Sequence, residues 1–415
     1  MKKSTAFGLA LLLAVPSVSS VALADGVEEI VEEVAEDIEG EETGEEVEEL
    51  ELIESLSLDM ALEQALEGNS SLMLLKYQLE IIENQEGNLN KDFRDAKFDV
   101  RDLERTRDKL RNVSGSFQDR LGIQNQLEAF EDVMEQLEKA IEQVKTGKAT
   151  LAYTDEEAKE SIKMATTATY TQLLMSEQQR KFQEKALKTK EKEIAVMKRQ
   201  LDLGLVSRTN YNKELREIER QKTAIEQSEK EWNKNLAEFA LDLGIIYHPD
   251  LSLQALKLSK PELLEQETET EELVENSFKY KSQLETISLA EFSRDKVYDD
   301  KDSNSYEKNE ADLNVKVEKE NLTKLKADAE ESIRKLYYDV EDGYQAILDA
   351  ERELKFAQED YQTLQRRYEL GLVSRVNYEL AQIQVEQAKL TLDLAKQSYF
   401  LLTKQVELLE AGVIQ

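Results

Sequence analysis

A nine-residue sequence that occurs twice is the feature that most limits how this chain can fold. Residues 203–211 read LGLVSRTNY and residues 370–378 read LGLVSRVNY, so eight of nine positions agree. Long, charged, helix-favouring stretches lie before and after both copies. A repeat of this kind predicts two copies of one structural unit.

Each copy is typical of a short turn between two helices. A glycine can take the left-handed conformation that ends many helices. A serine three residues later is a natural N-cap for the next helix, and an asparagine three positions on stands where a capping box has its acidic residue. These residues are, in pairs, Gly204 and Gly371, Ser207 and Ser374, and Asn210 and Asn377. Because the loop is so short, the flanking helices should run antiparallel as a hairpin.

The rest of the sequence favours long helices that pack together. Of three prolines, Pro249 and Pro261 lie between the two copies, which leaves the helical stretches on both sides of that pair without proline. From Tyr378 to Leu409, apolar residues recur at steps of three and four, as in a coiled-coil seam. A second partial seam predicts that this last helix packs on two sides. A helix over 318–370 would be roughly 80 Å long.

Several interruptions are predicted in these helices. Glycine, asparagine and serine favour breaks at Gly68-Asn69, at 112–116 and at Thr146-Gly147. A polar stretch at 296–310 is interpreted as a loop. The predicted divisions are a signal peptide at 1–24, an acidic disordered segment at 25–54, a first helical repeat at 55–248, a linker at 249–270 and a second helical repeat at 271–415.

The N-terminal segments predict export. Lys2 and Lys3 precede an apolar run of about ten residues and an A-x-A site that ends at Ala24, the pattern of a signal peptide; the alternative, a membrane anchor, needs a longer run. Residues 25–54 contain sixteen acidic and no basic side chains. We interpret them as a solvated tail. Binding of calcium or a basic partner is the alternative.

Composition argues against several classes of function. The net charge of −34 disfavours binding to nucleic acid. With no cysteine and one histidine, His248, the chain lacks the residues for the usual zinc sites, for histidine-based triads and for lipid attachment through an N-terminal cysteine. No glycine-rich phosphate loop is present. The sequence therefore predicts a protein that is not an enzyme and has no cofactor and no metal site.

Longer stretches around these motifs resemble the TolC-type outer-membrane efflux proteins. They are LSLDMALEQALEGNSSL at 56–72, RQLDLGLVSRTNY at 199–211, RRYELGLVSRVNY at 366–378, LDLGI at 241–245 and LLEAGVI at 408–414. The similarity covers most of residues 56–415 and includes the plan of two repeats. The paired turns and the opening stretch together make it fairly specific.

The resemblance implies a homotrimer in which each chain contributes two hairpins to a helical tunnel. The hairpin tips would dock onto a periplasmic adapter, a membrane fusion protein, which links the tunnel to an inner-membrane or ABC-type pump. The implied docking residues are Leu203, Gly204, Leu205, Ser207, Arg208, Leu370, Gly371, Leu372, Ser374 and Arg375. Asn210 and Asn377 fall where family members often carry an aspartate just inside the tunnel entrance. For Arg208 and Arg375, plain solvation is the alternative to partner contact.

The sequence departs from the family where two pairs of membrane-barrel strands are expected. Residues 86–150 remain charged and helical in pattern, and residues 290–325 carry charges on both faces. The predicted fold is therefore all-α: two repeats of long antiparallel hairpins with coiled-coil packing, a TolC-like α-barrel domain without a clear β-barrel.

Two functions are compatible with these features of the sequence. One is a component of an envelope efflux or secretion complex that forms a conduit or sheath. The other is a non-conducting structural or interaction protein of the cell envelope. The expected location is the outer membrane or periplasm in a host with two membranes, and the extracytoplasmic face or cell wall in a host with one.

Overall fold

The structure, a computed structural model, describes residues 54–111 and 113–414. The predicted signal peptide and nearly all of the acidic segment lie outside these residues. The helices are α2 (Leu58–Glu67), α3 (Ser70–Leu110), α4 (Phe117–Asp202), α5 (Arg208–Asp242), α6 (Thr270–Asn276), α7 (Phe278–Asp299), α8 (Ser305–Glu369) and α9 (Arg375–Glu410). Two short strands, β1 (Ser55–Leu56) and β2 (Ser252–Leu253), pair in parallel. The prediction of long helical hairpins is confirmed.

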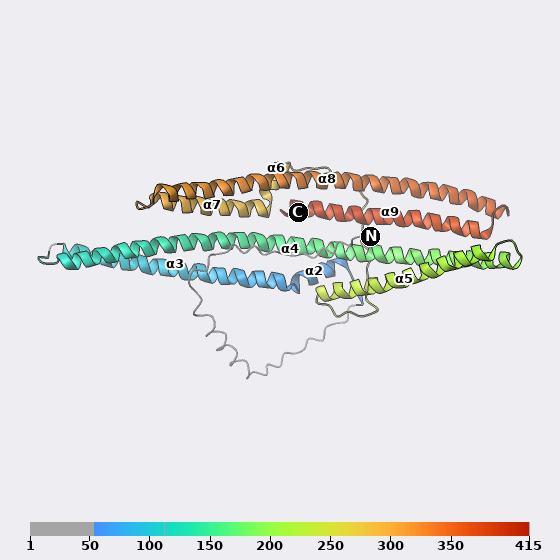
Figure 1. Cartoon of the computed structure of the whole chain (residues 1–415), viewed down its shortest axis with the longest axis horizontal. Helices are drawn as coiled ribbons and strands as arrows, with labels where there is room; N and C mark the ends of the chain where they lie inside the picture. The colour runs from blue at the N-terminus through green and yellow to red at the C-terminus, as the bar shows by residue number, and fades with distance from the viewer. Residues whose placement is uncertain (1–53, 112, 415) are drawn as a thin grey trace, which may run out of the picture. The chain divides into compact units, whose positions relative to one another are not determined.

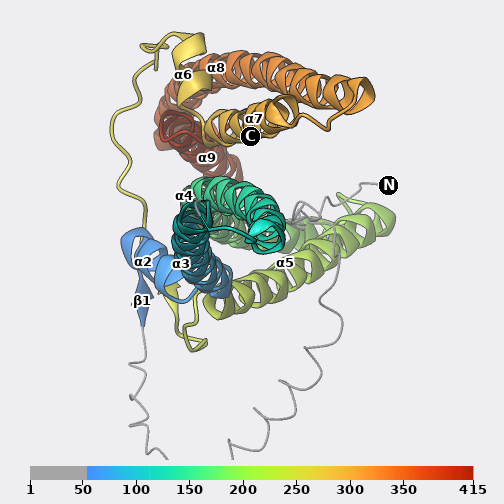
Figure 2. The ribbon, with the colours of Figure 1, turned by 90° about the vertical axis from the view of Figure 1, so that its left-hand side faces the viewer.

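The helices between Leu52 and the C-terminus form a layer in which α4 and α8 are the longest members, with 86 and 65 residues (Figure 1). Toward the turns that follow α4 and α8, neighbouring helices contact one another in the order α5, α4, α9, α8. Toward the other end the order is α3, α4, α7, α8. In both halves α8 is one edge of the layer, and α5 or α3 is the other. Figure 2 views these helices from one end.

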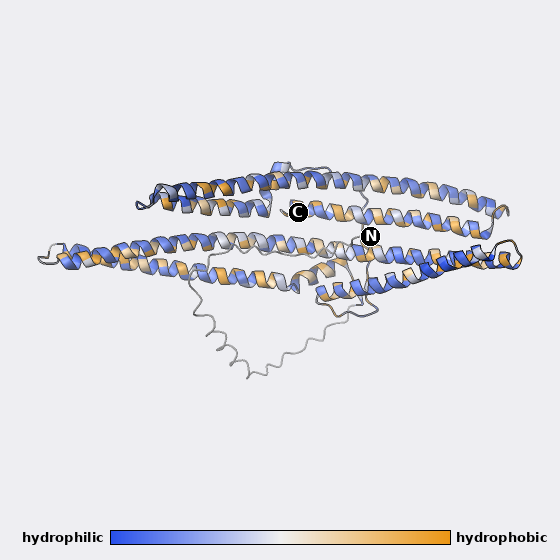
Figure 3. Ribbon diagram, in the orientation of Figure 1, coloured by the Kyte–Doolittle hydropathy of each residue, from blue (hydrophilic) through white to orange (hydrophobic). Residues whose placement is uncertain are grey.

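Hydrophobic residues alternate with hydrophilic ones along the long helices (Figure 3). Helix α9 contacts both α8 and α4, which confirms the predicted two-sided packing. On its first seam Leu392, Tyr399 and Val406 are buried, and on its second seam Leu408 is buried. None of the described helices combines the length and apolar character needed to cross a membrane.

Two predicted interruptions are found and a third is wrong. Helix α2 ends before Gly68, and the Asn69 side chain caps α3. The second break separates α3 from α4. Helix α4, however, continues through Gly147, because one glycine costs a long helix only about 1 kcal/mol. The predicted loop at 296–310 shrinks to 300–304, since the Asn304 side chain forms a capping box with Glu307 that starts α8.

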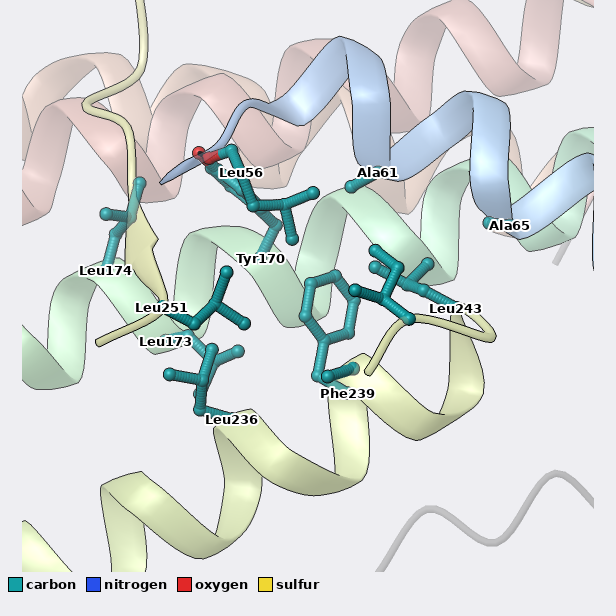
Figure 4. Close-up of a cluster of buried hydrophobic side chains, with 12 residues drawn as sticks. Leu56, Ala61, Ala65, Tyr170, Leu173, Leu174, Leu236, Phe239, Leu243 and Leu251 are labelled. Carbon is teal, nitrogen blue, oxygen red and sulfur yellow. Dashed lines mark hydrogen bonds between the residues drawn. The ribbon is translucent and has the colours of Figure 1, made fainter. Parts of the chain in front are cut away.

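A buried cluster where β1, α4 and α5 meet holds the first described residues against the long helices (Figure 4). Tyr170 lies at its centre with no exposed surface, and its ring meets Phe239 edge-on at 6.4 Å. The Tyr170 hydroxyl lies 2.9 Å from the carbonyl oxygen of Leu56 and 2.7 Å from that of Gln254, so it donates to one of them at a time. It thereby ties β1 and the segment after β2 to α4.

Tyr399 on α9 holds a later part of the segment between α5 and α6 against the second hairpin, which α8 and α9 form. Its hydroxyl donates to the carbonyl oxygen of Glu262 at 2.6 Å and accepts the N–H of Leu264 at 3.3 Å. The connection that contains Pro249 and Pro261 is thus attached at two points by buried tyrosines. These hydrogen bonds satisfy backbone groups that have no helical partner.

Replacing Tyr170 with phenylalanine should destabilise the protein by about 1–2 kcal/mol at neutral pH, because a buried hydrogen bond is lost. Burial raises the pKa of the Tyr170 hydroxyl from 10.0 to about 12. A pKa that is higher in the folded state gives a stabilisation that is complete below pH 10 and is lost as the pH rises through 12. Urea unfolding at neutral pH and in this alkaline range should show the gap between wild type and Tyr170→Phe closing. A gap that widens with pH would contradict the assignment.

Candidate functional site: the two hairpin tips

The turn between α4 and α5, the first tip, closes as a Schellman motif. The N–H of Gly204 donates to the carbonyl of Leu201 at 2.9 Å, and the N–H of Leu205 donates to that of Gln200 at 2.8 Å. Gly204 has a φ of +74°, the left-handed conformation that this motif needs. Ser207 then caps α5 by accepting the backbone N–H of Asn210 at 3.2 Å.

The turn between α8 and α9, the second tip, repeats this geometry. Gly371 has a φ of +72°, and its N–H donates to the carbonyl of Tyr368 at 2.9 Å. The N–H of Leu372 donates to the carbonyl of Arg367 at 2.8 Å, and Ser374 accepts the N–H of Asn377 at 3.3 Å. The predicted glycine conformation and serine caps are therefore confirmed at both turns.

The capping boxes are only half formed. In the part of the chain that the structure describes, neither asparagine side chain returns a hydrogen bond to the backbone of its serine, unlike Glu307 at the start of α8. The side chains of Asn210 and Asn377 are exposed on the first turn of their helices. Both side chains are consequently free to contact solvent or another molecule near the tips.

Each tip presents two leucines to solvent. Leu203, Leu205, Leu370 and Leu372 are between 67% and 74% exposed, although leucine is normally among the most buried residues. Val206 and Val373, the next residues along the chain, are half-buried. The four exposed leucines on two hydrogen-bonded turns are therefore candidate contacts for another molecule.

The two tip arginines differ in their surroundings. The Arg375 guanidinium lies 2.9 Å from the Glu379 carboxylate, which also lies 3.1 Å from the Lys192 ammonium on α4. These two cations, Lys192 first, lower the pKa of Glu379 below its ordinary value. One turn after Arg208 the chain has Asn212 instead, so Arg208 has no equivalent carboxylate on its own helix.

The ion pair between Lys192 and Glu379 also places the two tips side by side, because it joins the first hairpin to the second. A second such pair joins Lys185 to Glu386, at 3.3 Å and two turns farther from the tips. Both turns accordingly lie at the same end of the helix layer (Figure 1). The repeat sequence alone did not predict this contact, because the partners are 187 residues apart.

A tyrosine cluster supports the second tip, and the sequence reasoning missed it. The Tyr378 ring stacks on Tyr368 at 4.8 Å and on Tyr361 at 5.3 Å, and the hydroxyls of Tyr361 and Tyr378 are 2.5 Å apart. At the equivalent positions, the first hairpin has Ile194 and Leu201. The seven-residue spacing of Tyr361 and Tyr368, two helical turns, was the available signal.

Comparison with known proteins agrees with this arrangement. No protein-family model and no curated protein matches the chain. Among solved structures, the CmeC outer membrane channel of Campylobacter jejuni matches with a TM-score of 0.61 and 14% identity over 86% of each chain. The chain has a TolC-like fold.

Two further structures match in the same way. The open state of the MtrE outer membrane channel of Neisseria gonorrhoeae gives a TM-score of 0.59 at 13% identity, over 86% of this chain and 89% of MtrE. The outer membrane protein VceC of Vibrio cholerae gives 0.53 at 12% identity, over 86% of this chain and 96% of VceC. The resemblance seen in the sequence is thus confirmed for the fold.

Within this TolC-like fold, the tip glycines are expected to tolerate little change. Gly371→Val should cost about 1–2 kcal/mol, because a branched side chain resists the left-handed conformation. Gly371→Asn is the matched control, since asparagine accepts that conformation. Circular dichroism during thermal unfolding checks this prediction. Equal thermal stability of Gly371→Val and the wild type would mean that the turn does not depend on this glycine.

Proposed function

We propose that this protein is a TolC-like component of an envelope efflux or secretion complex. In this proposal it forms an oligomeric helical conduit or sheath and docks through its two hairpin tips onto an adapter of a membrane pump. The observation that carries the proposal is the pair of adjacent tips, each with two exposed leucines on a closed turn. Apolar side chains on a rigid turn lose little entropy when a partner covers them.

The edges of the helix layer support an assembly of several copies. Along α8, Leu313, Tyr338 and Phe356 are exposed. Each is separated from the next by nearly a whole number of helical turns, so the three lie on one face. Charged residues separate them along the helix, so they are three isolated apolar contacts on one face. Because α8 is an edge of the layer, a neighbouring copy covers this face in our proposal.

The opposite edge presents a short apolar patch. Met73, Leu74, Tyr77 and Ile81 on α3 are each at least half exposed and follow helical spacing. In this proposal the α8 edge of one copy contacts the α3 edge of the next. Such a heterologous contact, between two different surfaces of the same protein, closes into a ring when the rotation from copy to copy divides a full turn evenly. We propose three copies, with a channel that the curved layers enclose.

The tip residues then have distinct roles. Leu203, Leu205, Leu370 and Leu372 would fill apolar depressions of the adapter, and Arg208 would supply a charge-assisted contact at the rim. Arg375 would hold Glu379 and so stabilise the second tip. Asn210 and Asn377, one turn from the leucines, would line the entrance of the channel. No catalytic step is part of this proposal.

A cross-linking experiment tests the docking. The chain has no cysteine, so Ser207→Cys or Ser374→Cys introduces a single reactive thiol at a tip. Cross-linking in cells should yield an adduct with an adapter protein from either tip position. Ser176→Cys, at an exposed position in the middle of α4, is the matched control and should give none. Tip adducts that are absent, or no more frequent than those of Ser176→Cys, would reject the docking role.

A further inference from the structure

The hairpin of α3 and α4 projects beyond the rest of the layer at the end opposite the tips. An ion pair between Lys296 and Glu138 joins α7 to α4 near this end. Helix α7 ends at Asp299, one turn after Lys296, whereas α4 begins at Phe117, well before Glu138. At 1.5 Å per residue, the helix beyond the ion pair is about 5 Å long in α7 and about 30 Å long in α4. Figure 1 shows the projecting hairpin beside the shorter end of α7 and α8.

The charge of this projecting end is the reverse of that of the chain. Residues 105–121 carry five basic and two acidic side chains, although the whole chain has a net charge of −34. Arg105, Lys109 and Arg111 are exposed. Among the described residues, the ion pair closest to this end joins Lys139 to Glu135, which lies several helical turns into α4. In the part of the chain that the structure describes, no ion pair involves the basic residues of this end, and five basic against two acidic side chains leave it a net positive charge.

The same end exposes apolar side chains. Val113 is 53% exposed, Phe117 is 65% exposed and Leu121 is 46% exposed. Phe117 and Leu121 are four residues apart at the start of α4, so they share one face of the helix. Arg105 lies within the last two turns of α3, so the basic and apolar groups occupy roughly the last 10 Å of the hairpin.

The turn that carries these groups is closed by its own hydrogen bonds. Ser116 is buried, and its hydroxyl lies 2.7 Å from the carbonyl oxygen of Leu110 and 2.8 Å from that of Val113. Gly115 has a φ of +86°, which a residue with a side chain rarely adopts. Because the turn is fixed in this way, Val113 and Phe117 are held outward.

We propose that this end of the α3–α4 hairpin docks onto the surface of an anionic lipid membrane. Basic side chains are attracted to acidic headgroups, and apolar ones enter the boundary between headgroups and acyl chains to a depth of about 5–10 Å. A second copy of the same end would instead bring like charges together. A soluble polyanion would satisfy the charges but offer no place for the Phe117 ring. This surface is independent of the tips.

Flotation of the purified full chain with lipid vesicles tests the proposal. The protein should bind vesicles of phosphatidylcholine mixed with phosphatidylglycerol, should not bind phosphatidylcholine alone, and should dissociate at high salt. Each basic residue contributes about a fivefold factor in affinity, so a combined Arg105→Gln, Lys109→Gln and Arg111→Gln variant should lose on the order of 100-fold. Phe117→Ser should lose roughly tenfold.

The region around the turn between α7 and α8 provides matched controls. Residues 294–310 carry four basic and six acidic side chains, and Tyr306, the second residue of α8, is 84% exposed. Tyr306→Ser and the pair Lys301→Gln with Lys316→Gln should bind as wild type does. All substituted positions are solvent-exposed, and circular dichroism should confirm that each variant remains folded.

Several outcomes would overturn the proposal. One is no binding to the anionic vesicles, or equal binding to both lipids. Another is an equal loss of binding in the control variants.

Two further outcomes would show that something else covers this end. If the wild type does not bind vesicles and Phe117→Ser changes the oligomeric mass, a second copy covers it. If Phe117→Cys cross-links to residues 25–53, the acidic segment of the same chain covers it.

Discussion

Replacing Leu205 and Leu372 together with aspartate should weaken binding of the adapter protein by on the order of 100-fold or more, while the protein stays folded. Central apolar residues of an interface often contribute about 2 kcal/mol or more each, and a carboxylate in their place would be desolvated without a partner. Neither leucine has a structural role in the core, because 72% and 67% of their surfaces are exposed. The effect should therefore fall on binding.

The amount of adapter recovered with the tagged protein from solubilised envelopes measures this effect. Leu241→Asp is the matched control, because Leu241 near the end of α5 is 77% exposed and lies away from both tips. Capture should be unchanged in that variant. An equal loss for Leu241→Asp would indicate a general effect of added charge, and full capture by the tip variant would show that the leucines do not form the docking surface.

Ile347→Asp should destabilise the second hairpin by about 4 kcal/mol or more, because an aspartate there would be a buried carboxylate with no cation to pair with. Ile347 is 1% exposed and packs between α8 and α9 with Val340, Leu392 and Tyr399. The loss should release α9 from α8 first, since this seam is their shared core.

Urea unfolding and amide hydrogen exchange measure this destabilisation. Ala346→Asp adds the same charge at the neighbouring exposed position of α8 and should change stability by less than about 0.5 kcal/mol. Exchange should accelerate over α8 and α9 more than over α3. Similar unfolding curves for the two variants would show that the α8–α9 seam is not a core.

Local chemistry made the tips predictable from the sequence. A glycine at a helix end and a serine three residues later carry the turn and the cap on their own, and Gly204, Ser207 and their counterparts adopt the predicted geometry. The buried seam of α9 was likewise predictable, because apolar residues at steps of three and four lie on one face of a helix. These features depend on neighbours within one or two turns.

Features that depend on distant residues could not be read in this way. Gly147 looked like a break, but α4 packs on neighbours along its length and continues through it. The contact of Lys192 with Glu379 joins residues 187 apart, and nothing in either helix alone selects that partner. The positive end formed by α3 and α4 emerged only once the structure showed that α7 stops short of it.

In our proposal copies of this chain form a ring around a channel. Single-particle electron microscopy of the purified protein, with its mass measured by light scattering, tests this ring most directly. We expect three copies in which the α8 edge of one contacts the α3 and α5 edge of the next around an open axial channel, with six hairpin tips at one end. A stable monomer, or a solid bundle with no axial channel, would contradict it.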